Sequence, residues 1–133
     1  MVPRRRTVRG VTSAPLLVDR ADVRVTDKES TLVLGAAGMH VLYLPLRYDA
    51  AAEEVINSAG LVAPGAVNAW TLIDHDMSLE LQHRAAAVLG LPRDLRLHLN
   101  VGADTIRQVR TSLLEILQCA CFVVDTADGR ITG

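Results

Sequence analysis

Aromatic side chains are scarce in this sequence of 133 residues, which contains only Tyr43, Tyr48, Trp70 and Phe122. Proteins that bind single-stranded nucleic acid stack the bases on aromatic side chains, so this composition argues against such a function. Half of the residues are nevertheless hydrophobic, which is sufficient for the core of one ordinary domain. We therefore expect a core built from Leu, Val, Ile and Ala.

Cysteines and long apolar runs are also few. Cys119 and Cys121 are separated by one residue, a spacing that rarely closes a disulfide. The longest apolar run, residues 32–46, is too short to span a bilayer. Residues 11–15 follow the charged N-terminus but lack the apolar core of a signal peptide. We therefore predict a cytoplasmic protein that has no membrane partner.

Charge is distributed unevenly along the chain, although the net charge is only −1. Residues 1–47 carry eight basic and four acidic side chains, whereas residues 48–133 carry six basic and eleven acidic ones. The imbalance is greatest in a basic arm over residues 1–13, which has four arginines and no acid: Arg4, Arg5, Arg6 and Arg9. We interpret residues 14–133 as a single domain that follows this arm.

A basic arm and an acidic segment in one chain indicate an ionic contact within or between molecules. Residues 49–80 contain Glu53 and Glu54 among other acids, and they contain no lysine or arginine. We predict that the arm of one copy binds this acidic segment of a neighbouring copy. The expected partner is therefore a second copy of the chain, with another protein as the alternative.

The spacing of apolar residues changes near residue 48. Before it, continuous or alternating apolar residues predict strands, which we place at residues 15–18, 22–26, 31–34 and 39–46. The last two strands are apolar on both faces, so we expect them at the centre of a sheet. Residues 121–125 are also expected to form a strand, and residues 127–129 predict a hairpin turn after it.

After residue 48, apolar residues recur every three to four positions, which is typical of helices. We predict main helices at residues 49–59, 78–89 and 105–118 and a short helix at 92–98; residues 66–73 fit either type of element. The buried stripe of the third main helix is Ile106, Val109, Leu113, Ile116 and Leu117. The predicted fold is α+β, a single domain whose mostly antiparallel sheet has N-terminal strands plus a C-terminal strand, covered on one face by three main helices.

The densest cluster of metal-ligating residue types lies between residues 74 and 83. On a helix, Asp76, Glu80 and His83 would share one face, and carboxylate with imidazole suits a divalent transition metal. The apolar residues of that helix lie on its opposite side, so we interpret the cluster as a solvated polar face. We predict no metal and no other cofactor, and keep His75, Asp76, Glu80 and His83 as the alternative metal site.

The adjacent His75 and Asp76 resemble the His-Asp dyad of HD-type metal phosphohydrolases. That resemblance implies an all-helical, metal-dependent hydrolase, in which His40 and either Asp104 or Asp125 would complete the ligand set. A metal-dependent hydrolase is therefore one alternative function.

Residues 84–96 resemble the core of a helix-turn-helix, with Gly90 in the turn. The resemblance implies a DNA-binding regulator that uses residues 82–99 and the basic arm, with base or phosphate contacts from Arg84, Arg93, Arg96 and His98. Residues 80–133 are electroneutral, however, whereas DNA binding depends on counterion release at basic surfaces. We therefore predict no DNA-binding site and keep this function as an alternative.

No remaining motif assigns a reaction. Residues 35–38 contain two glycines after a strand, but the residues that follow are strand-like, so we predict a hairpin loop instead of a phosphate-binding loop. Residues 123–131 resemble the opening strand of sensory PAS domains, although a terminal hairpin accounts for them. We predict a non-enzymatic interaction and assembly module that self-associates.

Overall fold

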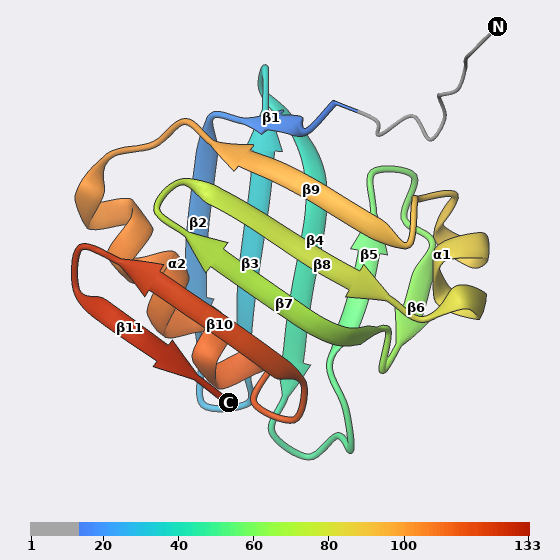
Figure 1. The fold of residues 1–133 in the computed structure, drawn as a ribbon. Coiled ribbons are helices and arrows are strands. Elements are labelled where there is room, and N and C mark those ends of the chain that lie inside the picture. The colour runs from blue at the N-terminus through green and yellow to red at the C-terminus, as the bar shows by residue number, and fades with distance from the viewer. Residues whose placement is uncertain (1–13) are drawn as a thin grey trace, which may run out of the picture.

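The computed structural model describes residues 14–133, of which 52% lie in strands and 18% in helices. Eleven strands form two sheets, and two helices accompany them (Figure 1). No helix in this part of the chain combines the length and apolar character that crossing a membrane requires. The predicted α+β fold with three main helices is therefore wrong, because β structure dominates.

One sheet has five strands, all antiparallel, in the order β2-β3-β4-β5-β6. Its strands are β2 (Arg20–Val25), β3 (Glu29–Ala36), β4 (Met39–Arg47), β5 (Glu54–Asn57) and β6 (Val62–Pro64). The β3–β4 hairpin turns at Ala37 and Gly38, which both have positive φ angles of 53° and 79°. This turn confirms the predicted hairpin between the two apolar strands.

The other sheet has six strands in the order β1-β9-β8-β7-β10-β11. Its strands are β1 (Leu16–Val18), β7 (Val67–Ile73), β8 (Asp76–Leu81), β9 (Asp94–Leu99), β10 (Cys121–Thr126) and β11 (Gly129–Thr132). The pairs β1–β9 and β7–β10 are parallel, and the other neighbours are antiparallel. The predicted strand at 121–125 and the hairpin that follows it are confirmed.

The two sheets share one apolar core because their inner faces are built from alternate residues of each strand. The six-stranded sheet contributes a row of fully buried side chains that includes Trp70, Leu72, Met77, Leu79, Leu95 and Leu97. The five-stranded sheet contributes Leu32, Leu34, Leu42 and Leu44. The predicted aliphatic core is therefore confirmed, with a single tryptophan added to it.

The two helices lie at opposite ends of the molecule (Figure 1). Helix α1 (His83–Leu89) packs near β6, and helix α2 (Ala103–Ile116) contacts β2, β3 and β4. The indole of Trp70 on β7 donates a hydrogen bond to the main-chain oxygen of Leu117 at 3.3 Å. Helix α2 is therefore tied to both sheets, and its position confirms the predicted helix at 105–118.

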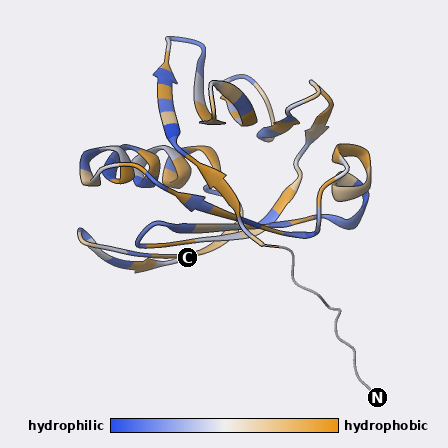
Figure 2. Cartoon of the chain, turned by 90° about the horizontal axis from the view of Figure 1, so that it is seen from above, coloured by the Kyte–Doolittle hydropathy of each residue, from blue (hydrophilic) through white to orange (hydrophobic). Residues whose placement is uncertain are grey.

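Both helices lie on one side of the six-stranded sheet, and Figure 2 shows that no described element covers its other side. This arrangement leaves a broad sheet surface exposed. The two faces of this sheet differ, since apolar side chains point to the core from one face and polar side chains point outward from the other.

Three helix predictions are wrong. Residues 94–98 of the predicted helix 92–98 instead belong to β9, in which Leu95, Leu97 and Leu99 alternate with outward-facing polar residues. Residues 78–81 belong to β8, so only the second part of the predicted helix 78–89 is helical. In the predicted helix 49–59, residues 49–52 form turns and bends, and residues 54–57 form β5. In β8 and β9 the apolar residues recur with a period of two, although Ser78 is typical of a helix N-cap and Pro92 of a first helical turn.

The packing of α2 predicts which substitutions unfold the domain. Leu113 is fully buried, and replacing it by alanine should lower the free energy of unfolding by about 2–5 kcal/mol because a cavity remains. Gln108 is exposed on the same helix, so Gln108→Ala should change it by less than about 0.5 kcal/mol. Urea denaturation measures both variants; equal midpoints would contradict this role of α2.

Candidate functional site

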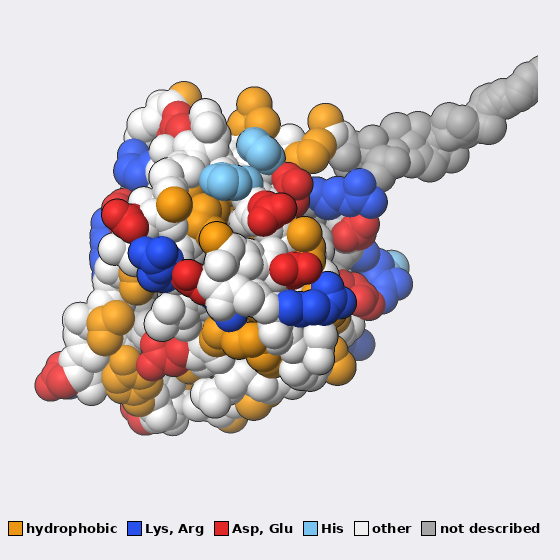
Figure 3. Space-filling view, turned by 60° about the vertical axis from the view of Figure 1, so that its left-hand side comes forward, with side chains coloured by type: hydrophobic (Ala, Val, Ile, Leu, Met, Phe, Trp, Pro, Cys, Tyr) orange, Lys and Arg blue, Asp and Glu red, His pale blue; other side chains and the backbone are white. Residues whose placement is uncertain are grey.

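The exposed side of the six-stranded sheet is the candidate site, and we call it the open face. It consists of the outward-facing side chains of five strands: Ala69, Thr71, Ile73, Asp76, Ser78, Glu80, Asp94, Arg96, His98, Cys121, Val123, Asp125, Arg130 and Thr132. The strand register joins them in rows, such as His98 beside Asp76, Asp76 beside Ile73, and Ile73 beside Asp125. Acidic and basic side chains are interspersed in Figure 3, and histidines gather near acidic side chains.

The half of the open face on β8 and β9 is charged. Asp76 Oδ1 lies 2.8 Å from His98 Nδ1, and Asp94 Oδ2 accepts a hydrogen bond from Arg96 Nε at 3.3 Å. Glu80 is exposed, and no basic side chain of residues 14–133 lies within ion-pair distance of it. The charged half therefore presents one carboxylate that the described residues leave uncompensated.

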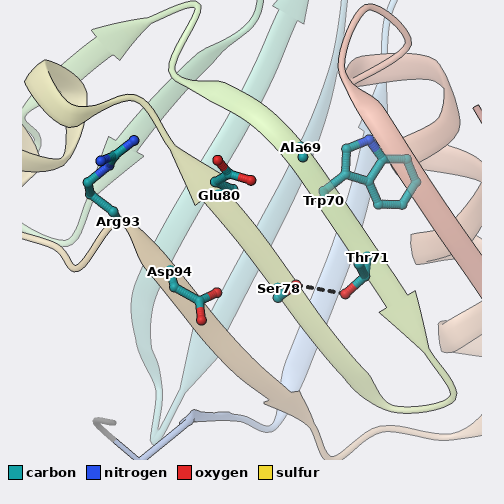
Figure 4. Close-up of a pocket in the computed structure, with 7 residues that line it drawn as sticks. All are labelled: Ala69, Trp70, Thr71, Ser78, Glu80, Arg93 and Asp94. Atoms are coloured by element: carbon teal, nitrogen blue, oxygen red, sulfur yellow. Dashed lines mark hydrogen bonds between the residues drawn. The ribbon is translucent and has the colours of Figure 1, made fainter. Parts of the chain in front are cut away.

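The half on β7 and β10, which borders Ser78 of β8, is close to neutral. Thr71 and Ser78 hydrogen-bond through their hydroxyl oxygens at 2.7 Å (Figure 4). A groove of about 510 Å³ runs beside them, lined also by Ala69, Trp70, Glu80, Arg93 and Asp94 (Figure 4). A second hollow of about 350 Å³ adjoins it at the same Thr71 and Ser78. Thr71 and Ser78 have short side chains, so they form a furrow between longer charged side chains.

The residues of the alternative metal site do not converge. Asp76 and Glu80 share the open face, but four residues along a strand separate their Cα atoms by about 13 Å. His83 begins α1, and His75 lies in the β7–β8 turn, where its Nε2 is 3.2 Å from the oxygen of Val101. Across residues 14–133, no three His, Cys, Asp or Glu side chains are arranged to hold a metal ion.

The further residues that the HD resemblance implied have other contacts. His40 lies on β4, where its ring is 4.6 Å from that of Tyr43. Asp104 pairs with Arg107 at 3.0 Å, and Asp125 pairs with Arg130 at 3.2 Å. The two acidic side chains are thus compensated by neighbouring arginines.

The segment that resembles a helix-turn-helix has only its first helix. Arg84 lies in α1, but Arg96 and His98 lie on β9, a strand inside a sheet. Arg93 precedes that strand, and its Nε is 3.5 Å from the oxygen of Leu81. These side chains therefore have no recognition helix to place them in a DNA groove.

The residues predicted to bind a partner fall in three different settings. Arg4, Arg5, Arg6 and Arg9 lie outside the described residues. Glu53 is 8% exposed; its Oε2 accepts a hydrogen bond from the Val67 N–H at 3.4 Å, and its main-chain oxygen accepts one from the Gly65 N–H at 2.7 Å. Glu54 is half-buried and lines a hollow with Arg24 and Arg47 on the five-stranded sheet. The acidic segment is therefore divided between two surfaces.

The neutral residues of the open face, notably Thr71, Ser78 and Val123, were not predicted from the sequence. The predicted helix at 78–89 is incompatible with the strand to which Ser78 belongs. The signal that identifies it is the alternation of Met77, Leu79 and Leu81 with polar residues, since a period of two turns every second side chain outward.

Glu53 has a structural position, because it joins the loop before β5 to the corner where the chain passes from β6 to β7. Glu53→Ala should lower the free energy of unfolding by about 1–3 kcal/mol, since a buried acceptor is lost and its donor stays buried. Glu54→Ala, at the half-buried neighbouring position, is the control and should have a smaller effect. A larger fall in the thermal unfolding midpoint for Glu54→Ala than for Glu53→Ala would contradict this role.

Comparison of the chain with protein-family models, curated proteins and solved structures finds no match. No relative therefore assigns a role to any residue of the open face. A function for that face is therefore inferred from its charges, contacts and exposure.

Proposed function

We propose that this chain is a non-enzymatic interaction module that self-associates, and that the open face is part of its contact surface. The observation that carries the proposal is the exposure of an entire side of a six-stranded sheet, which no described element covers. Sheets that face water on one side usually carry a solvated polar surface. Here charged residues line the edges of a furrow whose centre is the uncharged pair Thr71 and Ser78, an arrangement suited to contact with another protein surface.

The hydrogen bonding of the face supports binding over catalysis. Asp76, Asp94 and Asp125 each pair with a neighbouring basic side chain of the same sheet. The Thr71 and Ser78 hydroxyls bond to each other. Catalytic sites instead direct a nucleophile, a base and oxyanion donors toward one point in a concave pocket, and these groups are directed toward one another.

The charge of the face supports a second copy as the partner. Glu80 is an exposed carboxylate beside Asp94 in the register of β8 and β9, and the basic arm of the same sequence carries four arginines. An arm of about ten extended residues reaches on the order of 30 Å, far enough to cross between two copies. We propose that the arm of one copy contacts the charged half of the open face of another.

Light scattering over a concentration series tests this proposal. The full chain should associate reversibly, and its dimer fraction should fall as salt rises, because exposed ionic contacts are screened beyond about 8 Å at physiological salt. Removing residues 2–10 should also lower that fraction. A mass that stays monomeric at every concentration would contradict the proposal.

A charge-matched pair of variants locates the contact. Glu80→Gln removes one negative charge from the open face, and Glu115→Gln removes one from the exposed side of α2. Exposed ion pairs contribute about 0.2–1 kcal/mol, so Glu80→Gln should weaken association up to about fivefold while Glu115→Gln leaves it unchanged. Equal effects of the two variants on association would show that the open face is not part of the contact.

A further inference from the structure

Strand β11 is the outermost strand of the six-stranded sheet (Figure 1), and one of its sides has no neighbouring strand among the described residues. The hydrogen bonds to β10 determine which N–H and C=O groups of β11 point toward this unpaired side. Phe122 and Gly133 exchange two hydrogen bonds, each 3.0 Å long. In an antiparallel pair such bonds alternate, so Val124 with Ile131 is the next bonded pair. The N–H and C=O groups of Arg130 and Thr132 therefore point away from the sheet.

This pattern of free groups is self-complementary. If a second copy of β11 lies antiparallel with Ile131 opposite Ile131, then Arg130 of each copy lies opposite Thr132 of the other. All four outward N–H groups of the two strands then donate to outward carbonyl oxygens. The two isoleucines, each 41% exposed in the single chain, also cover each other. A two-fold axis through Ile131 satisfies both the main-chain groups and the apolar side chains.

The other sheet edges are less suited to such pairing. Charges and prolines protect edge strands from added partners. Strand β2 carries Arg20, Asp22 and Arg24, and β6 ends in Pro64. Strand β1 is only three residues long. Strand β11 has no proline, and its single charge is compensated by the Asp125 carboxylate.

We propose that two copies of this chain pair through β11, in antiparallel orientation and centred on Ile131, to form one continuous sheet. The inference rests on the proposed function, because it names a contact through which the self-association takes place. The neutral halves of the two open faces then lie on the same side of the joined sheet, next to the two-fold axis. The contact is small compared with a stable dimer interface of about 1,200–2,000 Å², so the dimer should be weak and concentration-dependent.

Cysteine cross-linking tests the register to one residue. At the proposed centre the two Ile131 Cα atoms form a non-hydrogen-bonded pair, about 4.5 Å apart, which a disulfide can bridge. In a Cys119→Ser, Cys121→Ser background, Ile131→Cys should form a disulfide-linked dimer in a glutathione redox buffer. The control is Thr132→Cys, on the same exposed strand, because its two copies would be more than about 7 Å apart, too far for a disulfide.

A second variant tests the main-chain contact without a new thiol. Thr132→Pro removes an outward N–H while the hydrogen bonds between β10 and β11 remain, so its unfolding midpoint should stay close to that of the native chain. Its dimer fraction in light scattering should fall.

The outcomes separate this inference from the proposed function. Preferential cross-linking at position 131 together with loss of association in Thr132→Pro supports the β11 contact. If the native chain associates but position 131 cross-links no better than position 132, the β11 contact is wrong and self-association stands. If the native chain is monomeric throughout, both are wrong.

Discussion

The alternation of apolar and polar residues in β8 and β9 is the constraint on which the other features depend. Every second side chain of these strands enters the core, among them Met77, Leu79, Leu95 and Leu97. Burial of a large apolar side chain contributes about 1.5–3 kcal/mol, so a shift of register by one residue would expose this whole set. The same alternation forces the polar residues between them onto the opposite side, and this is why the charged half of the open face exists.

The helices explain why that face stays open. Helix α2 lies on the core side of the six-stranded sheet, where Trp70 and Arg110 connect it to β7 and β10. Helix α1 lies at the other end, on the same side. No described element covers the other side, where outward polar residues hydrogen-bond across strands, as Asp76 does with His98. A face stabilised in this way is available for contact with a second molecule.

Much of the secondary structure was predictable, and the errors have physical causes. The N-terminal strands, α2 and the C-terminal hairpin follow from local periodicity and turn residues. The predicted helix at 78–89 combined apolar residues of two elements, since Leu81 ends β8 whereas Ala85 and Leu89 belong to α1. At 92–98, Pro92 is typical of a helix start, but the leucines after it alternate with polar residues as in a strand. Sheet pairing, and not local propensity, determines these segments.

The candidate site was less predictable than the fold because its parts come from distant segments. The parallel pairing of β7 with β10 brings Thr71 beside Val123, with α2 between them in the sequence. No spacing rule reveals that contact. The burial of Glu53 likewise depends on the corner before β7, which lies in a different part of the chain. Composition indicated an ionic contact, but only the fold shows which acids are exposed.

Amide hydrogen exchange at single residues tests self-association most directly. In one copy, the N–H groups of Arg130 and Thr132 face solvent, whereas that of Ile131 faces β10. Exchange at residues 130 and 132 should slow as protein concentration rises, while exchange at Ile131, already bonded within the sheet, should change far less. Fast exchange at residues 130 and 132 at every concentration would contradict self-association through β11.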